Sequence, residues 1–186
     1  MSLSEIVNNQ LTDKNTTHSY LDLYERLLNS KKTSASNVLE IGIYKGGSIK
    51  LWHDYFKNAN VYGLDIANVN QIPPFLKNNS RIKICPSTDA YNTNTINILK
   101  SVKFDMVLDD GPHTLNSMIV FVSEYSQMLA NDGILILEDV QSIDWINHLK
   151  NATPEHLKTC VEVYDLRHIK GRYDDIVYVI NKAKLA

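Results

Sequence analysis

Two acidic clusters stand where two apolar runs of the sequence end. One run leads into Asp109-Asp110, and another leads into Glu138-Asp139. Asp110, Glu138 and Asp139 offer the hard oxygen ligands that Mg²⁺ or Mn²⁺ prefers. Without a counter-ion, neighbouring carboxylates would repel one another and raise one another's pKa values. These three residues are therefore predicted to bind a divalent cation. The alternative is that they cap helices or accept backbone hydrogen bonds.

A histidine follows the first cluster closely. His113 lies three residues beyond Asp110. An imidazole exchanges protons near neutral pH, so it can act as a general base beside a metal-bound hydroxyl group. We assign catalytic roles to His113 and Asp110. The alternative for His113 is a histidine that starts a helix and bonds to the backbone.

A glycine-containing turn forms a second candidate site. Glu40, Gly42 and Gly46 lie in this turn, and Asp65 follows the next apolar run. Glycine lets a ligand approach the backbone, and a carboxylate at the next strand end suits both hydroxyls of a ribose. Three residues separate Gly42 from Gly46, which is not the dinucleotide spacing and counts against an oxidoreductase. The turn resembles the S-adenosylmethionine loop of class I methyltransferases; an ordinary turn is the alternative.

Strands must alternate with helices to position these residues. Apolar runs predict strands, and helical periodicity predicts the segments between them. The strands are expected at 37–42, 61–66, 81–85, 104–109, 133–137, 160–166 and 176–180, and the helices at 17–28, 48–56, 93–102, 114–131 and 143–150, with a weakly ordered connection broken at Pro73-Pro74. The last two strands leave no room for a helix, so they should form an antiparallel hairpin.

This order predicts an α/β fold. We expect a Rossmann-like class I methyltransferase sandwich with a mostly parallel, seven-stranded sheet and a C-terminal antiparallel hairpin. Residues 1–186 should form a single methyltransferase domain, with an N-terminal helical lid segment at 1–36 and the Rossmann-like core at 37–186. Parallel strands would bring both acidic clusters to one edge of the sheet, where open α/β folds bind ligands.

Composition excludes several functional classes. A formal net charge of -2 and an isoelectric point of about 6.3 argue against a nucleic-acid partner. The first residues contain no signal-peptide pattern, and no apolar run is long enough to span a bilayer. Cys85 and Cys160, each within an apolar run, are expected to be buried free thiols. We therefore predict a cytoplasmic protein with no membrane partner.

The motifs together resemble a family, the metal-dependent sugar O-methyltransferases of antibiotic pathways. These include the macrocin, mycinamicin and tetracenomycin-rhamnose O-methyltransferases, with the cephalosporin hydroxylase-type proteins in the same superfamily. The resemblance is carried by residues 12–14, 18–20, 24–25, 38–42, 46–48, 61–66, 109–113, 137–141 and 171–175. Pro112 departs from the family, which more usually has a small residue such as Ser there. The chain also lacks the extra N-terminal domain of some relatives, so acceptor recognition or assembly is expected to differ.

The resemblance implies S-adenosylmethionine and Mg²⁺ (or Mn²⁺) as cofactors. Asp65 would hold the ribose, and Glu40 and Gly42 would line the cofactor site. Asp109 would serve the cofactor or only support its loop. Lys14 and His18 would close over the cofactor or substrate.

The predicted reaction is O-methylation of a sugar hydroxyl. A cation held by Asp110, Glu138 and Asp139 would chelate two neighbouring hydroxyls of the sugar, and His113 would accept the proton of one of them. Two alternatives stay open: methylation of a catechol-like molecule, and a non-catalytic partner protein that binds S-adenosylmethionine. The expected partner is a small-molecule or glycan sugar acceptor, and assembly into a homo-oligomer is left open.

Overall fold

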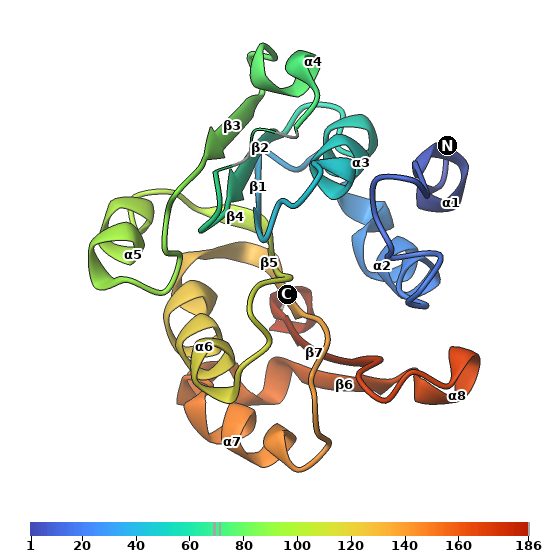
Figure 1. The fold of residues 1–186 in the computed structure, drawn as a ribbon. Coiled ribbons are helices and arrows are strands. Elements are labelled where there is room, and N and C mark those ends of the chain that lie inside the picture. Colours follow the sequence, from blue (N-terminus) through green and yellow to red (C-terminus); the bar gives the residue numbers. More distant parts are fainter. Residues whose placement is uncertain (69, 71, 186) are drawn as a thin grey trace.

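One seven-stranded sheet organises the chain (Figure 1). The computed structural model describes residues 1–68, 70 and 72–185. The strand order is β3-β2-β1-β4-β5-β7-β6, and β7 runs antiparallel to both of its neighbours. The strands are β1 (Asn37–Ile41), β2 (Asn60–Leu64), β3 (Ile82–Cys85), β4 (Phe104–Asp109), β5 (Leu129–Leu137), β6 (Val161–Asp165) and β7 (Ile176–Asn181). The predicted α/β class, mostly parallel sheet and C-terminal hairpin are confirmed.

Helices cover both faces of this sheet, as Figure 1 shows. The N-terminal helices and α3 share one hydrophobic core with the sheet, and α5, α6 and α7 share the other. The helices are α1 (Leu3–Ile6), α2 (Leu21–Leu28), α3 (Gly47–Tyr55), α4 (Pro74–Lys77), α5 (Thr93–Leu99), α6 (Leu115–Val120), α7 (Trp145–Ala152) and α8 (Arg167–Lys170). Short helical turns add η1 (Asn29–Lys31), η2 (Phe121–Tyr125), η3 (Ser126–Met128), η4 (Glu155–Cys160) and η5 (Lys182–Leu185).

The central strands are apolar because both of their faces are covered. Met106 and Leu108 of β4 pack into the first core, whereas Val107 between them packs into the second. All three side chains are fully buried. From Met106 to Leu108 the strand is apolar and buried, and the next polar residue, Asp109, stands at the end of the strand.

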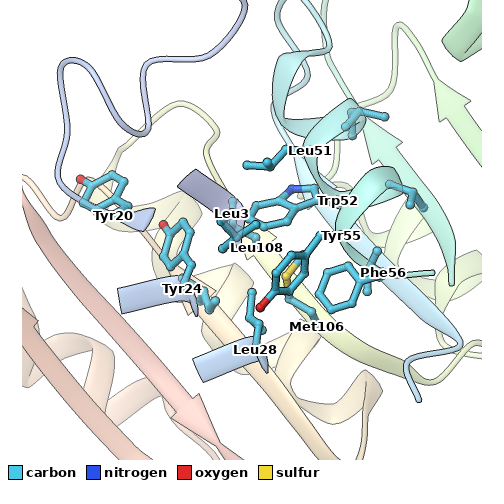
Figure 2. Close-up of a cluster of buried hydrophobic side chains, with 14 of the residues drawn as sticks. Leu3, Tyr20, Tyr24, Leu28, Leu51, Trp52, Tyr55, Phe56, Met106 and Leu108 are labelled. Atoms are coloured by element: carbon cyan, nitrogen blue, oxygen red, sulfur yellow. The ribbon is translucent and has the colours of Figure 1, made fainter. Parts of the chain in front are cut away.

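Aromatic side chains fill the core between the N-terminal segment and α3 (Figure 2). Tyr20, Tyr24 and Trp52 are all 0% exposed. The ring centroid of Tyr24 lies 5.7 Å from that of Tyr20 and 6.0 Å from that of Trp52. These contacts pack the N-terminal segment against α3.

The structure corrects several predicted elements. The helix expected at 17–28 begins at Leu21, because residues 18–20 pass over the sheet edge and make polar contacts there. Pro74 opens the short helix α4, since proline suits the first helical position. The crossover helix is regular only at α6 and continues as a π-helical turn, η2, and a 3₁₀ turn, η3.

Three further differences lie near the strands. β5 begins at Leu129, four residues before the predicted start at Gly133. The hairpin between β6 and β7 does contain a helix, the four-residue α8. Cys160 is buried as expected, but Cys85 is exposed because it ends β3, the strand at the edge of the sheet. Among the described residues, none of the helices combines the length and the apolar character needed to cross a bilayer.

Candidate functional site

A pocket of about 940 Å³ opens at the carboxyl ends of the parallel strands. Gly42 after β1, Asp65 after β2 and Asp110 after β4 line it. Residues 9–13 of the N-terminal segment also line it. Open α/β sheets bind their ligands at this edge. The pocket therefore lies where the sequence predicted it.

Gly42 is held where the first turn passes closest to the loop after β4. Its φ is 88°, and a Cβ atom there would overlap with the carbonyl oxygen of Asp110. Its N–H donates to the carbonyl of Leu64 at 2.9 Å. Only glycine fits this backbone, because the first turn packs directly against the loop after β4. The role of the turn in letting a ligand approach stays a prediction.

Replacing Gly42 with alanine should distort both loops. We expect the left-handed φ and the overlap to cost about 1–3 kcal/mol in the free energy of unfolding. S-adenosylhomocysteine should bind at least about tenfold more weakly, a change that isothermal titration calorimetry can measure. Gly171→Ala is the matched control, since Gly171 has a φ of 72° but no atom within 4 Å of the position that a Cβ atom would take. Equal losses in the two variants would contradict the close-approach argument.

Asp65 joins the glycine turn to the second strand. Its Oδ2 accepts hydrogen bonds from the amides of Ile43 and Tyr44, at 2.8 and 3.1 Å. Its Oδ1 accepts one from the amide of Ala67 at 2.8 Å. The carboxylate is therefore fixed at the wall of the pocket by three backbone donors.

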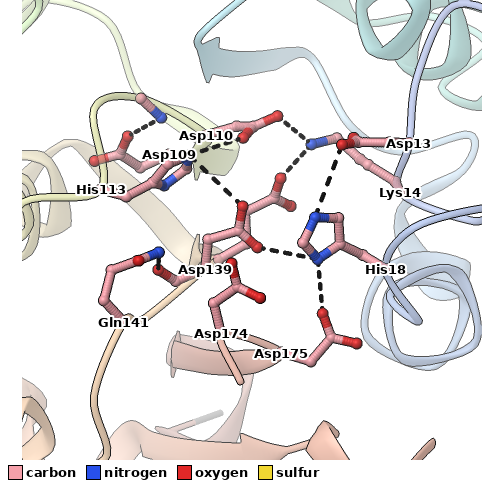
Figure 3. Close-up of polar contacts among 12 residues, drawn as sticks. Asp13, Lys14, His18, Asp109, Asp110, His113, Asp139, Gln141, Asp174 and Asp175 are labelled. Carbon is pink, nitrogen blue, oxygen red and sulfur yellow. Dashed lines mark hydrogen bonds and ion pairs between the residues drawn. The ribbon is translucent and has the colours of Figure 1, made fainter. Parts of the chain in front are cut away.

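Carboxylates from three strand ends meet around one lysine, and Figure 3 shows the contact of this lysine with Asp110. The Lys14 ammonium lies 2.8 Å from Asp110 Oδ2 and 3.3 Å from Glu40 Oε1, and it also donates to Glu138 Oε1. Lys14 is 1% exposed. Burial opposes the charged form, but the carboxylates outweigh it and hold the pKa of Lys14 well above its ordinary value. The N-terminal segment thus inserts a buried cation among the acids.

The other predicted cation ligand contacts a histidine and a tyrosine. Asp139 Oδ1 accepts a hydrogen bond from the Tyr20 hydroxyl and lies 3.3 Å from His18 Nδ1. The same His18 nitrogen lies 2.6 Å from Asp175 Oδ1. The ring of His18 stacks on that of Tyr20, with 4.9 Å between centroids. His18 therefore contacts acidic side chains of the core.

His113 faces the acidic cluster from the pocket side. Its Nε2 lies 3.7 Å from Asp110 Oδ1 and 3.6 Å from Asp139 Oδ2. These three residues offer ligand atoms within 4.8 Å of one another and all line the pocket. His113 and Asp139 have φ values of 52° and 56°, a conformation that is uncommon outside glycine and concentrates at functional sites.

Burial strengthens the electrostatic coupling within the cluster. Burial and the charge of Asp110 raise the pKa of Glu138 well above its ordinary value, although Lys14 opposes the shift. Burial also raises the pKa of Glu40 to about 7 and raises that of Asp139. The carboxylates of the cluster outnumber its one lysine, and a bound divalent cation would favour their ionised forms.

Several predicted cofactor residues lie beside the pocket instead of on its wall. Glu40 is fully buried, accepts a hydrogen bond from Trp52 Nε1 at 3.0 Å and contacts Lys14. Asp109 accepts hydrogen bonds from the Tyr91 hydroxyl and the Gly111 amide, at 2.7 and 2.9 Å, so it shapes the loop that carries Asp110 and His113. Burial raises its pKa to about 7.

Gly46, Lys14 and His18 complete this group. Gly46 precedes α3 with a φ of 79° and faces Ile72 and Leu76. Lys14 and His18 both belong to the segment that covers the acidic cluster. The cofactor contacts of these three residues stay predictions.

The charged side chains of the loop between β6 and β7 form hydrogen bonds and ion pairs with other groups of the protein. Lys170 donates to the carbonyls of Thr16 and His18, at 3.1 and 2.7 Å, and so ties down the N-terminal segment. Arg172 pairs with Asp174 at 2.9 Å, and Arg167 pairs with Asp165 at 2.7 Å. These contacts give the loop a supporting role in the fold.

Sequence reasoning missed two tyrosines that contact the site. Tyr20 and Tyr24 fall within the helix predicted at 17–28 and were given no role in the site, but their hydroxyls donate to Asp139 and Glu138. A signal was present, because a buried tyrosine hydroxyl needs a partner and two of them lie four residues apart.

The strand order, the pocket at the strand ends and the glycine turn define a class of protein. The fold is the Rossmann-like fold of class I S-adenosylmethionine-dependent methyltransferases. A model of the FtsJ-like methyltransferase family matches residues 19–177, so the chain belongs to that family.

The curated relatives are O-methyltransferases by name, and the name of the first includes a rhamnosyl group. The chain is 26% identical over 142 residues to the 8-demethyl-8-alpha-L-rhamnosyl tetracenomycin-C 2'-O-methyltransferase of Streptomyces olivaceus, covering 72% of this chain and 36% of that protein. It is 26% identical over 166 residues to the mycinamicin VI 2''-O-methyltransferase of Micromonospora griseorubida, covering 82% and 39%. The chain thus spans well under half the length of these relatives.

A solved structure shares the fold. The MycE methyltransferase from the mycinamycin biosynthetic pathway, in complex with Mg and SAH, aligns with a TM-score of 0.75 and 19% identity. The alignment covers 97% of this chain and 55% of that one. At this identity the likeness shows the fold alone.

Proposed function

We propose that this chain is a methyltransferase domain that transfers the methyl group of S-adenosylmethionine to a sugar hydroxyl and requires a divalent cation. One observation carries the proposal: the turn with Gly42 and Asp65, and the cluster of Asp110, Asp139 and His113, line the same pocket. A pocket of about 940 Å³ lies within the range of small-molecule sites. The names of the curated relatives support a sugar as the acceptor.

The residues present fit a divalent cation. Asp110 and Asp139 offer oxygen atoms close to His113, and Glu138 shares the Lys14 ammonium with Asp110. The cluster therefore already supports a positive charge and carries more carboxylates than one ammonium neutralises. Asp110, Glu138 and Asp139 would hold Mg²⁺ or Mn²⁺, which when bound would make a sugar hydroxyl more acidic.

The remaining roles belong to the residues of the pocket. Gly42 and Asp65 would bind the nucleoside of S-adenosylmethionine, a donor whose methyl group is already activated. His113 would accept the proton of the attacking hydroxyl. Because the donor is activated, most of the catalysis would come from positioning and electrostatics.

Other features stay part of the proposal. These are the cofactor contacts of Glu40, Gly46, Asp109, Lys14 and His18, the division into a lid segment at 1–36 and a core at 37–186, the cytoplasmic location, the small-molecule or glycan acceptor without nucleic acid or membrane, and the kinship with cephalosporin hydroxylase-type proteins. Homo-oligomer formation also stays open.

Methyl transfer from radiolabelled S-adenosylmethionine tests the proposal. We expect transfer to glycosides such as rhamnosides, loss of transfer in a chelator, and recovery with Mg²⁺ or Mn²⁺. Preference for catechols would replace the acceptor class with the catechol alternative. Transfer that survives the chelator would remove the cation from the proposal. Binding of S-adenosylhomocysteine without transfer to any acceptor would instead favour a non-catalytic partner protein.

A further inference from the structure

Two buried tyrosines point their hydroxyl groups at consecutive carboxylates. Tyr20 donates to Asp139 Oδ1, and Tyr24 donates to Glu138 Oε2. Figure 2 shows both rings at the edge of the aromatic core, with their hydroxyls on the same side. Neither tyrosine is among the residues that line the pocket. They therefore act on the site through the carboxylates.

The two tyrosines are spaced so that they can contact two consecutive residues, Asp139 and Glu138. Tyr20 precedes the first residue of α2, and Tyr24 lies four residues later, so both are on one face. Asp139 has a φ of 56°, so the chain turns immediately after Glu138. One helical turn of α2 thus reaches both carboxylates.

Each hydroxyl occupies one oxygen atom of its carboxylate. Asp139 Oδ1 is taken by Tyr20, whereas Oδ2 faces His113 at 3.6 Å. Glu138 Oε2 is taken by Tyr24, whereas Oε1 faces Lys14. The hydrogen bonds therefore leave the other oxygen of Asp139 facing His113 and the other oxygen of Glu138 facing Lys14.

The phenols can only donate in this environment. Each hydroxyl lies against a carboxylate oxygen, which accepts hydrogen bonds, so the phenol O–H is the donor in both contacts. A hydrogen bond to a carboxylate stabilises its ionised form, which is the form that binds a cation.

We propose that Tyr20 and Tyr24 are positioning residues of the cation site. Each orients one carboxylate ligand through the hydrogen bond that its hydroxyl donates. This inference rests on the proposed function, because it takes Glu138 and Asp139 as cation ligands. The start of α2 thus has a part in building the site.

Cation binding by single phenylalanine variants tests the inference. Tyr20→Phe and Tyr24→Phe each remove one hydroxyl and keep the ring. The probe is Mn²⁺ alone, titrated into the full chain without S-adenosylmethionine and followed by electron paramagnetic resonance. We expect each variant to bind Mn²⁺ about 10–100-fold more weakly than the wild type, the range seen when outer partners of metal ligands are lost.

Tyr55→Phe is the matched control. Tyr55 is 2% exposed and belongs to the same hydrophobic core, but its hydroxyl donates to Glu25 Oε1 at 3.2 Å, outside the acidic cluster. We expect its Mn²⁺ affinity to equal that of the wild type. Thermal unfolding monitors the fold of all variants, and if Tyr24→Phe does not fold, Tyr20→Phe alone decides.

The outcomes separate this inference from the proposed function. Wild-type affinity for Mn²⁺ in Tyr20→Phe and Tyr24→Phe would overturn the positioning role and leave the proposed function standing. An equal loss of affinity in Tyr55→Phe would also overturn it, because the effect would then be general packing. A wild-type protein that binds no Mn²⁺ would overturn both.

Discussion

Replacing His113 with asparagine should lower the rate of methyl transfer by about 10²–10⁴-fold, the usual contribution of a positioned general base. His113 lines the pocket, and its Nε2 lies 3.6–3.7 Å from the nearest oxygens of Asp139 and Asp110. No other imidazole lines the pocket among the described residues. Steady-state rates with S-adenosylmethionine and a saturating acceptor measure the effect.

Asparagine is the appropriate replacement at this position. His113 has a φ of 52°, and asparagine tolerates this left-handed conformation better than alanine does. The thermal stability of the variant should therefore stay close to that of the wild type. His148→Asn, at an exposed position of α7, is the control and should keep full activity. If His113→Asn also keeps full activity, His113 is not the base.

Replacing Lys14 with methionine should destabilise the protein by about 3–5 kcal/mol, the usual cost of removing one partner from a buried ion pair. The Lys14 ammonium contacts Glu40, Asp110 and Glu138, and the side chain is 1% exposed. Methionine keeps most of the side-chain volume but leaves the three carboxylates without this cation. Unfolding in urea measures the free energy.

A divalent cation should recover part of the loss. Under the proposed function Mg²⁺ binds the folded acidic cluster, so it should raise the melting temperature of Lys14→Met more than that of the wild type. Lys150→Met, at an exposed position of α7, should change the free energy of unfolding by less than about 0.5 kcal/mol. A loss below about 1 kcal/mol in Lys14→Met would mean that the ammonium is not the main counter-ion of the cluster.

The sequence alone was sufficient to predict the sheet and its functional edge. The run through Val107 and Leu108 is apolar on both faces, and β4 is buried on both faces in the structure. A right-handed crossover makes successive strands parallel, so the strand ends that carry Asp110 and Asp139 had to meet at one edge. The apolar runs that mark buried strands are visible in short stretches of sequence, which is why this part of the fold was predictable.

Only the tertiary structure decided how the N-terminal segment meets that edge. Lys14 and Asp110 are 96 residues apart in the sequence, and His18 and Asp175 are 157 apart. Contacts at such separation depend on how α2 packs against the sheet, and helical periodicity shows only which face is buried. The same periodicity placed Tyr20 and Tyr24 in the core but could not show where their hydroxyls point. Those directions depend on the left-handed turn at Asp139, a backbone conformation that its residue type does not specify.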